Sequence, residues 1–314
     1  MDRSPILVDR SPIAHGRAFE LPGGPDAVLL LHGLTGSTFE VYPVAERLEA
    51  AGMRCLAPLL AGHGGTPADL VGVPWTDWIA QAWRELQRLE GARRTFVVGC
   101  SMGALVGCAL AHDHPERVDG LVLLAPALEL QLQGKLGAFL GGFRPLRDVV
   151  IPKGAGSDVR DEEARRRNPC LAGMPLGAIA ELASLQQHVD RQLPGVAAPA
   201  LVIIGAHDHT VTVAGARRLA RRIGSGPART IVLPESWHLV GVDVEREAVA
   251  DETLAFLDAI PVPGAARAVP ARRGPRPSRH RGREALRAVG GRTGAAPAKK
   301  KKGKPRRGRS TKRR

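Results

Sequence analysis

Ser101, Asp208 and His238 carry the side chains that nucleophilic catalysis uses, and they follow one another in this order along the chain. A serine hydroxyl is a weak nucleophile until a neighbouring base takes its proton, and that base needs a carboxylate to orient it. On an open parallel sheet such groups follow successive late strands in the order serine, acid, histidine. The spacing therefore predicts Ser101 as nucleophile, His238 as general base and Asp208 as the orienting carboxylate.

Ser101 lies at the centre of the pattern Gly99-Cys100-Ser101-Met102-Gly103, between an apolar run and a helix of small residues. A chain that reverses so sharply strains the backbone of its central residue, and glycines on both sides avoid Cβ clashes. The pattern predicts a nucleophile elbow with Ser101 at its apex and Cys100 as a buried packing thiol. A purely structural glycine-serine turn is the alternative.

Other roles are open for the acid and the base. Asp208 could instead cap the helix that follows it, in which case Asp243 would orient the base. His238 could be a surface-loop histidine. His207 and His209 flank Asp208 and could be read as metal ligands, although no third ligand lies at a useful spacing. We expect three further histidines to have structural roles, at a helix end or in a loop: His63, His112 and His114.

Acyl transfer also needs two N–H donors aimed at the oxygen that becomes negatively charged. Met102 directly follows the nucleophile, at the amino end of a helix whose dipole favours a negative charge. Leu34 follows His32-Gly33 in the turn after an earlier apolar run. We therefore expect the backbone amides of Leu34 and Met102 to form an oxyanion hole.

Apolar runs and helical patterns alternate along most of the chain, which favours an α/β fold with a mostly parallel sheet and right-handed crossovers. The expected strands are 17–20, 27–31, 53–57, 97–98, 120–124, 200–205 and 230–233. The expected helices are 41–51, 75–90, 105–112, 128–140, 177–193, 213–223 and 244–260. The alternation stops between 126 and 196, so we interpret this segment as a helical cap inserted into a core of residues 1–125 and 197–262.

Five motifs together resemble the α/β-hydrolase superfamily. They are Leu29-Leu30-Leu31-His32-Gly33-Leu34-Thr35-Gly36-Ser37, Gly62-His63-Gly64, Gly99-Cys100-Ser101-Met102-Gly103, His207-Asp208 and Trp237-His238. Within the superfamily the chain most resembles bacterial carboxylesterases and monoacylglycerol lipases, and the match runs from about Arg17 to Ile260 in order and spacing. The resemblance implies an α/β-hydrolase fold and the same nucleophile, base, acid and oxyanion donors.

Two features depart from this family pattern and bear on the choice of substrate. The bulky Trp237 precedes the histidine where the family often has a small residue, and the cap sequence matches little. Apolar residues of the cap could line an acyl pocket over the nucleophile, or they could pack between cap and core. These residues include Leu136, Phe139, Leu140 and Phe143.

The chemistry predicted here is that of a serine hydrolase. We expect it to cleave carboxylic esters through an acyl-enzyme on Ser101, with a small-molecule ester that carries an apolar acyl chain as substrate. Neither a metal nor an organic cofactor is expected. The alternatives are an acyltransferase that uses the same three residues, and a non-catalytic hydrolase-fold scaffold localised by its tail.

The charge of the chain is divided unequally. Residues 263–314 hold 20 Lys or Arg against the single acid Glu284, a net charge of +19, and residues 1–262 carry a net charge of −5. Because the tail contains no Phe, Tyr or Trp, we expect it to be disordered and to bind nucleic acid or anionic surfaces without sequence specificity. A solubilising extension without a dedicated partner is the alternative.

Cysteine usage and hydropathy bear on the compartment. Cys55, Cys100, Cys108 and Cys170 show neither disulfide-type nor metal-type spacing, which favours reduced thiols. No apolar run approaches the roughly 18 residues that span a bilayer, and the first residues lack the features of a signal peptide. We therefore expect a cytoplasmic protein without a transmembrane segment.

Overall fold

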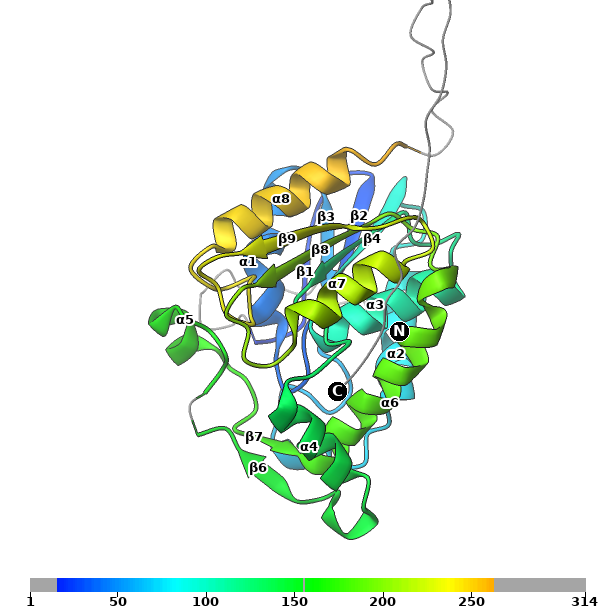
Figure 1. Cartoon of the computed structure of the whole chain (residues 1–314). Coiled ribbons are helices and arrows are strands. Elements are labelled where there is room, and N and C mark those ends of the chain that lie inside the picture. Colours follow the sequence, from blue (N-terminus) through cyan, green and yellow to red (C-terminus); the bar gives the residue numbers. More distant parts are fainter. Residues whose placement is uncertain (1–15, 155, 263–314) are drawn as a thin grey trace, which may run out of the picture. The chain divides into compact units, whose positions relative to one another are not determined.

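The computed structural model describes residues 16–154 and 156–262. At its centre is a seven-stranded sheet with the strand order β1-β3-β2-β4-β5-β8-β9 (Figure 1). β1 is antiparallel to β3, and every other neighbouring pair is parallel. The strands are β1 (Phe19–Leu21), β2 (Asp26–Leu31), β3 (Arg54–Ala57), β4 (Arg94–Cys100), β5 (Gly120–Leu124), β8 (Ala200–Gly205) and β9 (Arg229–Leu233).

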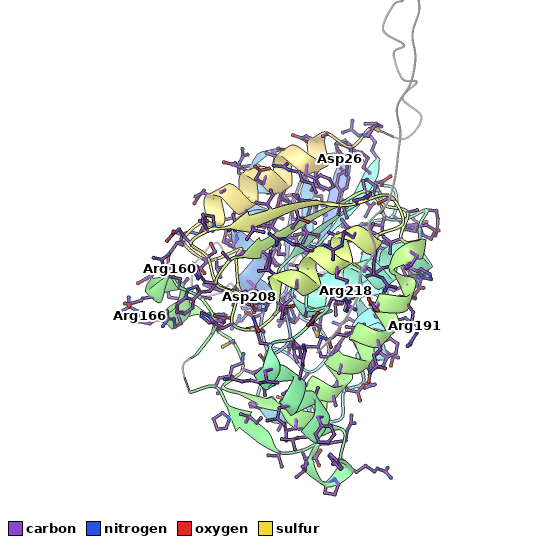
Figure 2. The ribbon with its side chains drawn as sticks, in the orientation of Figure 1. Asp26, Arg160, Arg166, Arg191, Asp208 and Arg218 are labelled. Atoms are coloured by element: carbon purple, nitrogen blue, oxygen red, sulfur yellow. The ribbon has the colours of Figure 1, made fainter. Side chains whose placement is uncertain are left out.

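The central strands are apolar because both faces of the sheet are covered. Every residue of β2, β4, β5 and β8 is buried, as a parallel sheet between two helix layers requires. Their carboxyl ends share one edge of the sheet, and the loops that follow them emerge there. Figure 2 shows Asp208, just after β8, at the opposite end of the sheet from Asp26, the first residue of β2.

Helices cover both faces of this sheet (Figure 1). α1 (Tyr42–Ala50) and α8 (Arg246–Asp258) share one hydrophobic cluster with Val28 and Leu30 of β2. α2 (Trp75–Gln87), α3 (Met102–Asp113) and α7 (Val213–Arg222) share the other cluster with Leu29 and Leu31. Alternate residues of one strand thus enter opposite layers. The expected α/β-hydrolase architecture, a mostly parallel sheet flanked by helices, is confirmed.

Between β5 and β8 the chain forms residues 126–196, which we call the cap segment. It contains α4 (Leu132–Gly141), β6 (Val150–Pro152), α5 (Glu162–Arg167), β7 (Gly173–Pro175) and α6 (Leu176–Gln192). β6 and β7 pair in a separate antiparallel sheet, which the sequence analysis did not predict. α6 contacts both α3 and α4, so it attaches the cap segment to one of the helix layers.

The start of α4 differs from the helix expected there. The helix expected from residue 128 begins only at Leu132, because Leu130 forms a β-bridge with Val211 and the Gln131 amide donates to the carbonyl oxygen of Thr210.

None of the helices within the described ranges combines the length and apolar character needed to cross a bilayer. The basic tail, residues 263–314, lies outside the described residues.

Candidate active site

Ser101 occupies the sharp turn between β4 and α3. Its backbone angles are φ 53° and ψ −109°, a region where a residue with a Cβ is strained. A Cβ on Gly99 would collide with the backbone of Gly103, and a Cβ on Gly103 would collide with the carbonyl oxygen of Leu31. Because only glycine fits at these two positions, the turn has the geometry of a nucleophile elbow.

Three side chains singled out from the sequence meet at this turn. His238 Nε2 lies 3.0 Å from Ser101 Oγ, and His238 Nδ1 lies 2.7 Å from Asp208 Oδ2. Asp208 follows β8 and His238 follows β9, at the sheet edge where β4 ends directly before Ser101. All three residues are buried, so their hydrogen bonds form in a medium of low dielectric constant.

The second carboxylate oxygen of Asp208 fixes the loop after β8. Asp208 Oδ1 accepts the backbone N–H of Thr210 at 2.8 Å and that of Val211 at 2.7 Å. The following helix, α7, is capped by the Thr212 hydroxyl, which accepts the Gly215 amide. Asp208 is therefore not the cap of α7, and both of its oxygens hold it beside the imidazole.

Asp243, the alternative acid, organises the backbone instead. Its carboxylate accepts backbone N–H groups of four residues at 2.7 to 3.2 Å: Arg160, Asp161, Trp237 and Val244. These bonds tie the cap segment to the loop after β9. Within the described part of the chain Asp243 makes no hydrogen bond to His238, which favours Asp208 as the partner of the imidazole.

Carboxylates near His238 favour its charged form. Burial opposes a charge on the imidazole, but Asp208, Asp158 and Glu40 outweigh burial and raise the pKa of His238 above its usual value. An imidazole with this preference is suited to take a proton from a neighbouring hydroxyl.

The amides expected to form an oxyanion hole are free donors. The N–H groups of Leu34 and Met102 donate to no other group in residues 16–154 and 156–262. Met102 is the first residue of α3, so its N–H has no partner inside the helix. Leu34 and Ser101 line the same cavity.

Residues 25–245 match the family model described as serine aminopeptidase, S33. The chain belongs to this family. The matched range contains Ser101, Asp208 and His238 together with the loops that hold them.

Relatives of this S33 family member are matched over nearly their whole length. The thermostable monoacylglycerol lipase of Bacillus sp. (strain H-257) is 27% identical over 252 residues, covering 80% of this chain and 98% of the relative. The carboxylesterase of Bacillus subtilis is 25% identical over 248 residues, covering 77% of this chain and 96% of the relative. A solved structure reported with LipS and LipT, two metagenome-derived lipolytic enzymes, has a TM-score of 0.71 and 29% identity, covering 78% and 98% of the two chains. The expected resemblance to bacterial carboxylesterases and monoacylglycerol lipases is confirmed.

Two further histidines of the S33 chain support the loop after β2. His63 Nε2 accepts the Thr35 amide at 3.0 Å, and His32 Nε2 accepts the Leu60 amide at 3.0 Å. Burial lowers the pKa of His32 to about 3 and that of His63 to about 4. Both rings therefore stay neutral and keep the nitrogen lone pair that accepts. The expected loop role of His63 is confirmed.

Asp158, in the cap segment, belongs to none of the sequence motifs described above. Its carboxylate accepts the His209 amide at 3.0 Å and the Thr210 hydroxyl at 2.9 Å, and it lies 2.8 Å from His209 Nδ1. Its backbone carbonyl accepts the amides of His238 and Leu239. One cap residue thus joins the loops after β8 and β9.

In the loop around Asp208, the side chain of His209 contacts an acid and an aromatic ring. His209 pairs with Asp158 and meets the ring of Trp237 edge to face. The described residues contain no group of three or more His, Cys, Asp or Glu that could hold a metal ion. Trp237 also lies against the guanidinium of Arg165 and does not line the cavity beside Ser101, so it does not narrow that cavity.

A cavity of about 320 Å³ opens beside Ser101, between the loop after β2 and the cap segment. Its apolar lining consists of Leu34, Leu130, Ile151, Pro152, Met174, Ile179, Leu182 and Leu239. Apolar residues of the cap segment do line this cavity, but the four named from the sequence are not among them. Leu136, Phe139 and Phe143 are exposed, and Leu140 packs against the hydrophobic core. A different side of α4, with Gln133 and Gly134, faces the cavity.

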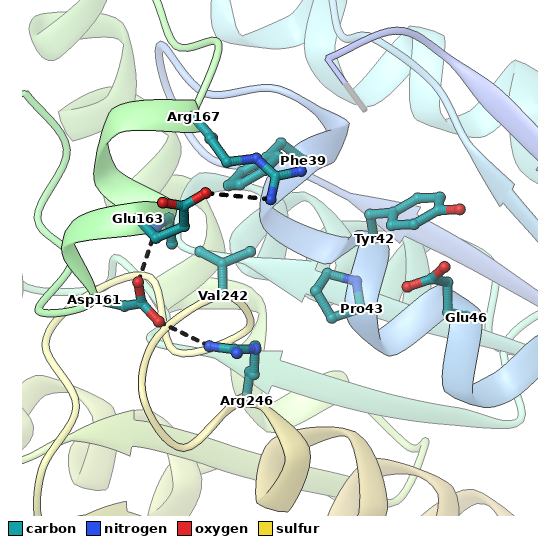
Figure 3. Close-up of a pocket in the computed structure, with 10 residues that line it drawn as sticks. Phe39, Tyr42, Pro43, Glu46, Asp161, Glu163, Arg167, Val242 and Arg246 are labelled. Atoms are coloured by element: carbon teal, nitrogen blue, oxygen red, sulfur yellow. Dashed lines mark hydrogen bonds and ion pairs between the residues drawn. The ribbon is translucent and has the colours of Figure 1, made fainter. Parts of the chain in front are cut away.

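A second cavity, of about 190 Å³, lies between α1, α5 and the start of α8 (Figure 3). Four of its charged groups form two pairs: Arg246 lies 2.9 Å from Asp161, and Arg167 lies 3.7 Å from Glu163. None of the three residues that meet at the elbow lines it. The first cavity is therefore the candidate active site.

Proposed function

We propose that this S33 family member is a carboxylic ester hydrolase that forms an acyl-enzyme on Ser101. The observation that carries the proposal is the hydrogen-bonded chain from Ser101 through His238 to Asp208 at the wall of a cavity. The names of the two relatives, a monoacylglycerol lipase and a carboxylesterase, support this reaction class.

The proposed reaction has two halves. His238 Nε2 takes the hydroxyl proton while Ser101 Oγ bonds to the ester carbonyl carbon. The amides of Leu34 and Met102 donate to the carbonyl oxygen as it becomes negative. The bond from that carbon to the alcohol oxygen then breaks, and the imidazolium protonates the leaving alcohol. A water molecule, deprotonated by the same imidazole, finally hydrolyses the acyl-enzyme.

We propose a small ester with an apolar acyl chain as substrate. The cavity lies in the size range of small-molecule sites. Its apolar side chains, among them Met174 and Ile179, would favour a hydrocarbon chain over a charged group.

Replacement of the nucleophile tests the proposal. We expect Ser101→Ala to lose nearly all hydrolysis of p-nitrophenyl esters, because neither the imidazole nor the oxyanion donors can form the acyl bond. The assay uses a series of esters from short to long acyl chain. The wild-type enzyme should show a burst of p-nitrophenol equal to the enzyme concentration when deacylation is slow.

A matched control separates the nucleophile from serines in general. Ser184 lies exposed on α6, and its hydroxyl donates to the Ala180 carbonyl oxygen of the same helix. Ser184→Ala should hydrolyse the whole ester series like the wild type. Equal activity of Ser101→Ala and wild type would refute the proposal, as would a folded wild type inactive on every ester.

The family description favours a second candidate, the removal of amino-terminal residues from peptides. That reaction needs a group that binds a free α-ammonium. Two carboxylates line the cavity, but Asp158 already binds His209 and Thr210, and Glu40 binds the Gly33 amide. We therefore place ester hydrolysis first, and amino acid p-nitroanilides assayed beside the esters would decide between them.

The same acyl-enzyme intermediate can also undergo acyl transfer. The acyl group on Ser101 would then pass to an acceptor alcohol in place of water. Product analysis with glycerol added to the ester assay distinguishes the two reactions, because transfer yields a new glyceryl ester and hydrolysis yields only the free acid.

A further inference from the structure

A buried carboxyl group lies beside the proposed active site and takes no part in the hydrogen bonds from Ser101 through His238 to Asp208. Glu40 belongs to the short 3-10 helix η1 (Thr38–Val41) that follows the loop after β2. The residue is only 3% exposed, yet it lines the cavity beside Ser101. An acid this deeply buried is costly unless it has hydrogen-bond partners.

One hydrogen-bond partner of Glu40 belongs to the proposed oxyanion loop. Glu40 Oε2 accepts the Gly33 amide at 2.7 Å. The Thr35 amide donates to His63 at 3.0 Å, and the Gly36 amide donates to the Gly33 carbonyl oxygen at 3.1 Å. Among residues 33–36, Leu34 alone keeps an N–H without an acceptor in the described chain.

The loop is also shaped around this carboxyl group. A Cβ on Gly36 would collide with the Glu40 carboxyl oxygens. A Cβ on Gly33 would lie 3.1 Å from both Glu40 Oε2 and Ser101 Cβ. The Glu40 carboxyl group therefore lies against both Gly33 and Gly36, on the side of Gly33 that also faces Ser101.

Accepting this hydrogen bond does not require a negative charge. Burial raises the pKa of Glu40, although the Gly33 amide, Lys153 and His238 oppose the effect. Both the carboxylate and the neutral acid have an oxygen that accepts from an amide. The contact with the Gly33 amide therefore needs the acceptor oxygen of this side chain and not its charge.

We propose that Glu40 is a positioning residue of the oxyanion hole: it holds the Gly33 peptide so that the next amide, that of Leu34, points at the reacting carbonyl oxygen. This inference rests on the proposed acyl-enzyme function. Without the acceptor the Gly33 peptide is free to rotate. The Leu34 amide, one of the two proposed oxyanion donors, is then no longer held toward the reacting carbonyl oxygen.

Substitutions at Glu40 test the inference through the split between kcat and KM. Loss of a whole oxyanion donor costs about 10² to 10³ in kcat, so misalignment of one in Glu40→Ala should cost about 10- to 100-fold. KM should change little, because the donor acts on the transition state. Glu40→Gln keeps the acceptor oxygen without the charge and should recover most of kcat.

Glu46→Ala is the matched control. Glu46 is an exposed carboxylate on α1, close in sequence and away from the Ser101 cavity, and its substitution should leave kcat and KM at wild-type values. Glu40→Gln as slow as Glu40→Ala would overturn the inference in favour of an electrostatic role.

A transition-state mimic adds a readout that a purely structural role would not move. A trifluoromethyl ketone adds reversibly to the serine and places an alkoxide in the oxyanion hole. Its inhibition constant should rise in Glu40→Ala by the factor by which kcat/KM falls. An unchanged inhibition constant in a folded Glu40→Ala protein would overturn the inference.

Gly36→Ala disturbs the same contact, between Gly36 and the Glu40 carboxyl group, from the loop. It replaces Glu40→Ala as the test if that variant fails to fold. The new methyl group displaces the Glu40 carboxyl group, so kcat should fall as in Glu40→Ala. In a folded Gly36→Ala/Glu40→Ala double variant the glycine substitution should cost nothing further, because its collision partner is gone. A Gly36→Ala variant with wild-type kcat would overturn the inference.

Ser101→Ala, assayed beside these variants, separates the two proposals. Activity that survives in Ser101→Ala refutes the acyl-enzyme itself. An inactive Ser101→Ala together with a wild-type Glu40→Ala refutes only the positioning role.

Discussion

At the scale of single residues, burial and neighbouring charge decide which imidazole can act as a base. His238 lines the cavity, whereas His32 and His63 support the loop after β2, and burial lowers the pKa of His32 to about 3 and that of His63 to about 4. Within the described residues, His238 is the one of the three that is hydrogen-bonded to a carboxylate. It is therefore the one whose proton affinity suits catalysis near neutral pH.

The pH dependence of activity should reflect this environment. The base must be neutral to take a proton, so kcat/KM should fall as the pH drops through the pKa of His238, which lies above the ordinary value of about 6.5. Asp158→Asn removes one of the charges that stabilise the imidazolium. We expect the midpoint of the pH profile to move to lower pH in this variant.

The matched control is another acid of the cap segment. Asp161 caps α5 and pairs with Arg246, and it is not among the groups that raise the pKa of His238. Asp161→Asn should keep the wild-type midpoint. A midpoint that stays in place in Asp158→Asn would show that this carboxylate does not act on the base.

At the scale of elements, the cap segment has an inner and an outer surface of different character. Met174 of β7 and Ile179 of α6 line the cavity, and α6 also packs on α3. Most of the large exposed apolar side chains of the described residues lie on α4, on β6 or between them, and Ile151 among them also lines the cavity. They are Leu132, Leu136, Phe139, Phe143, Val149, Val150 and Ile151. The inner surface therefore sets the shape available to a substrate.

Two substitutions to tryptophan compare these surfaces. Met174→Trp fills part of the cavity, so kcat/KM should fall more for long-chain than for short-chain p-nitrophenyl esters. Phe139→Trp changes a residue that is 65% exposed and outside the cavity, so its chain-length profile should match the wild type. Identical profiles for both variants would contradict the proposed acyl pocket.

At the scale of the whole molecule, the excess of positive charge and the proposed active site lie in different parts of the chain. Ser101, Asp208, His238 and the cavity all lie within residues 16–262. Residues 263–314 carry a net charge of +19 and lie outside the described residues. Their binding to polyanions remains a prediction, as does the cytoplasmic location inferred from the cysteines, which are free thiols in the structure.

Removal of the basic tail should separate binding from catalysis. A chain that ends at Val262 should keep wild-type kcat/KM for a neutral short-chain ester, because it retains every residue of the proposed site. The full chain should bind a fluorescent single-stranded DNA at low salt and release it as salt rises, and the shortened chain should not bind. Equal DNA binding by both chains would place the interaction outside the tail.

Much of the fold and the three reacting side chains could be predicted from local sequence. Continuous apolar runs predicted β2, β5 and β8 to within a residue, because strands covered on both faces are apolar throughout. The pattern around Ser101 predicted the elbow. The positions of Asp208 and His238 after later strands predicted their meeting, since parallel strands end at one edge.

Other parts had no local signal. β6 and β7 are three residues long, too short for a periodic pattern. Asp158 reaches His209 across 51 positions of the chain. Glu40 belongs to no catalytic motif, and its role follows from one amide seven residues away.

The sequence by itself determined which residues can react and which strands carry them, because side-chain type and hydrophobic period are local properties. Only the tertiary structure decided which carboxylates face His238, which loop amide stays free, and which cap residues line the cavity. These features depend on distances between segments that are far apart along the chain, and packing alone sets those distances.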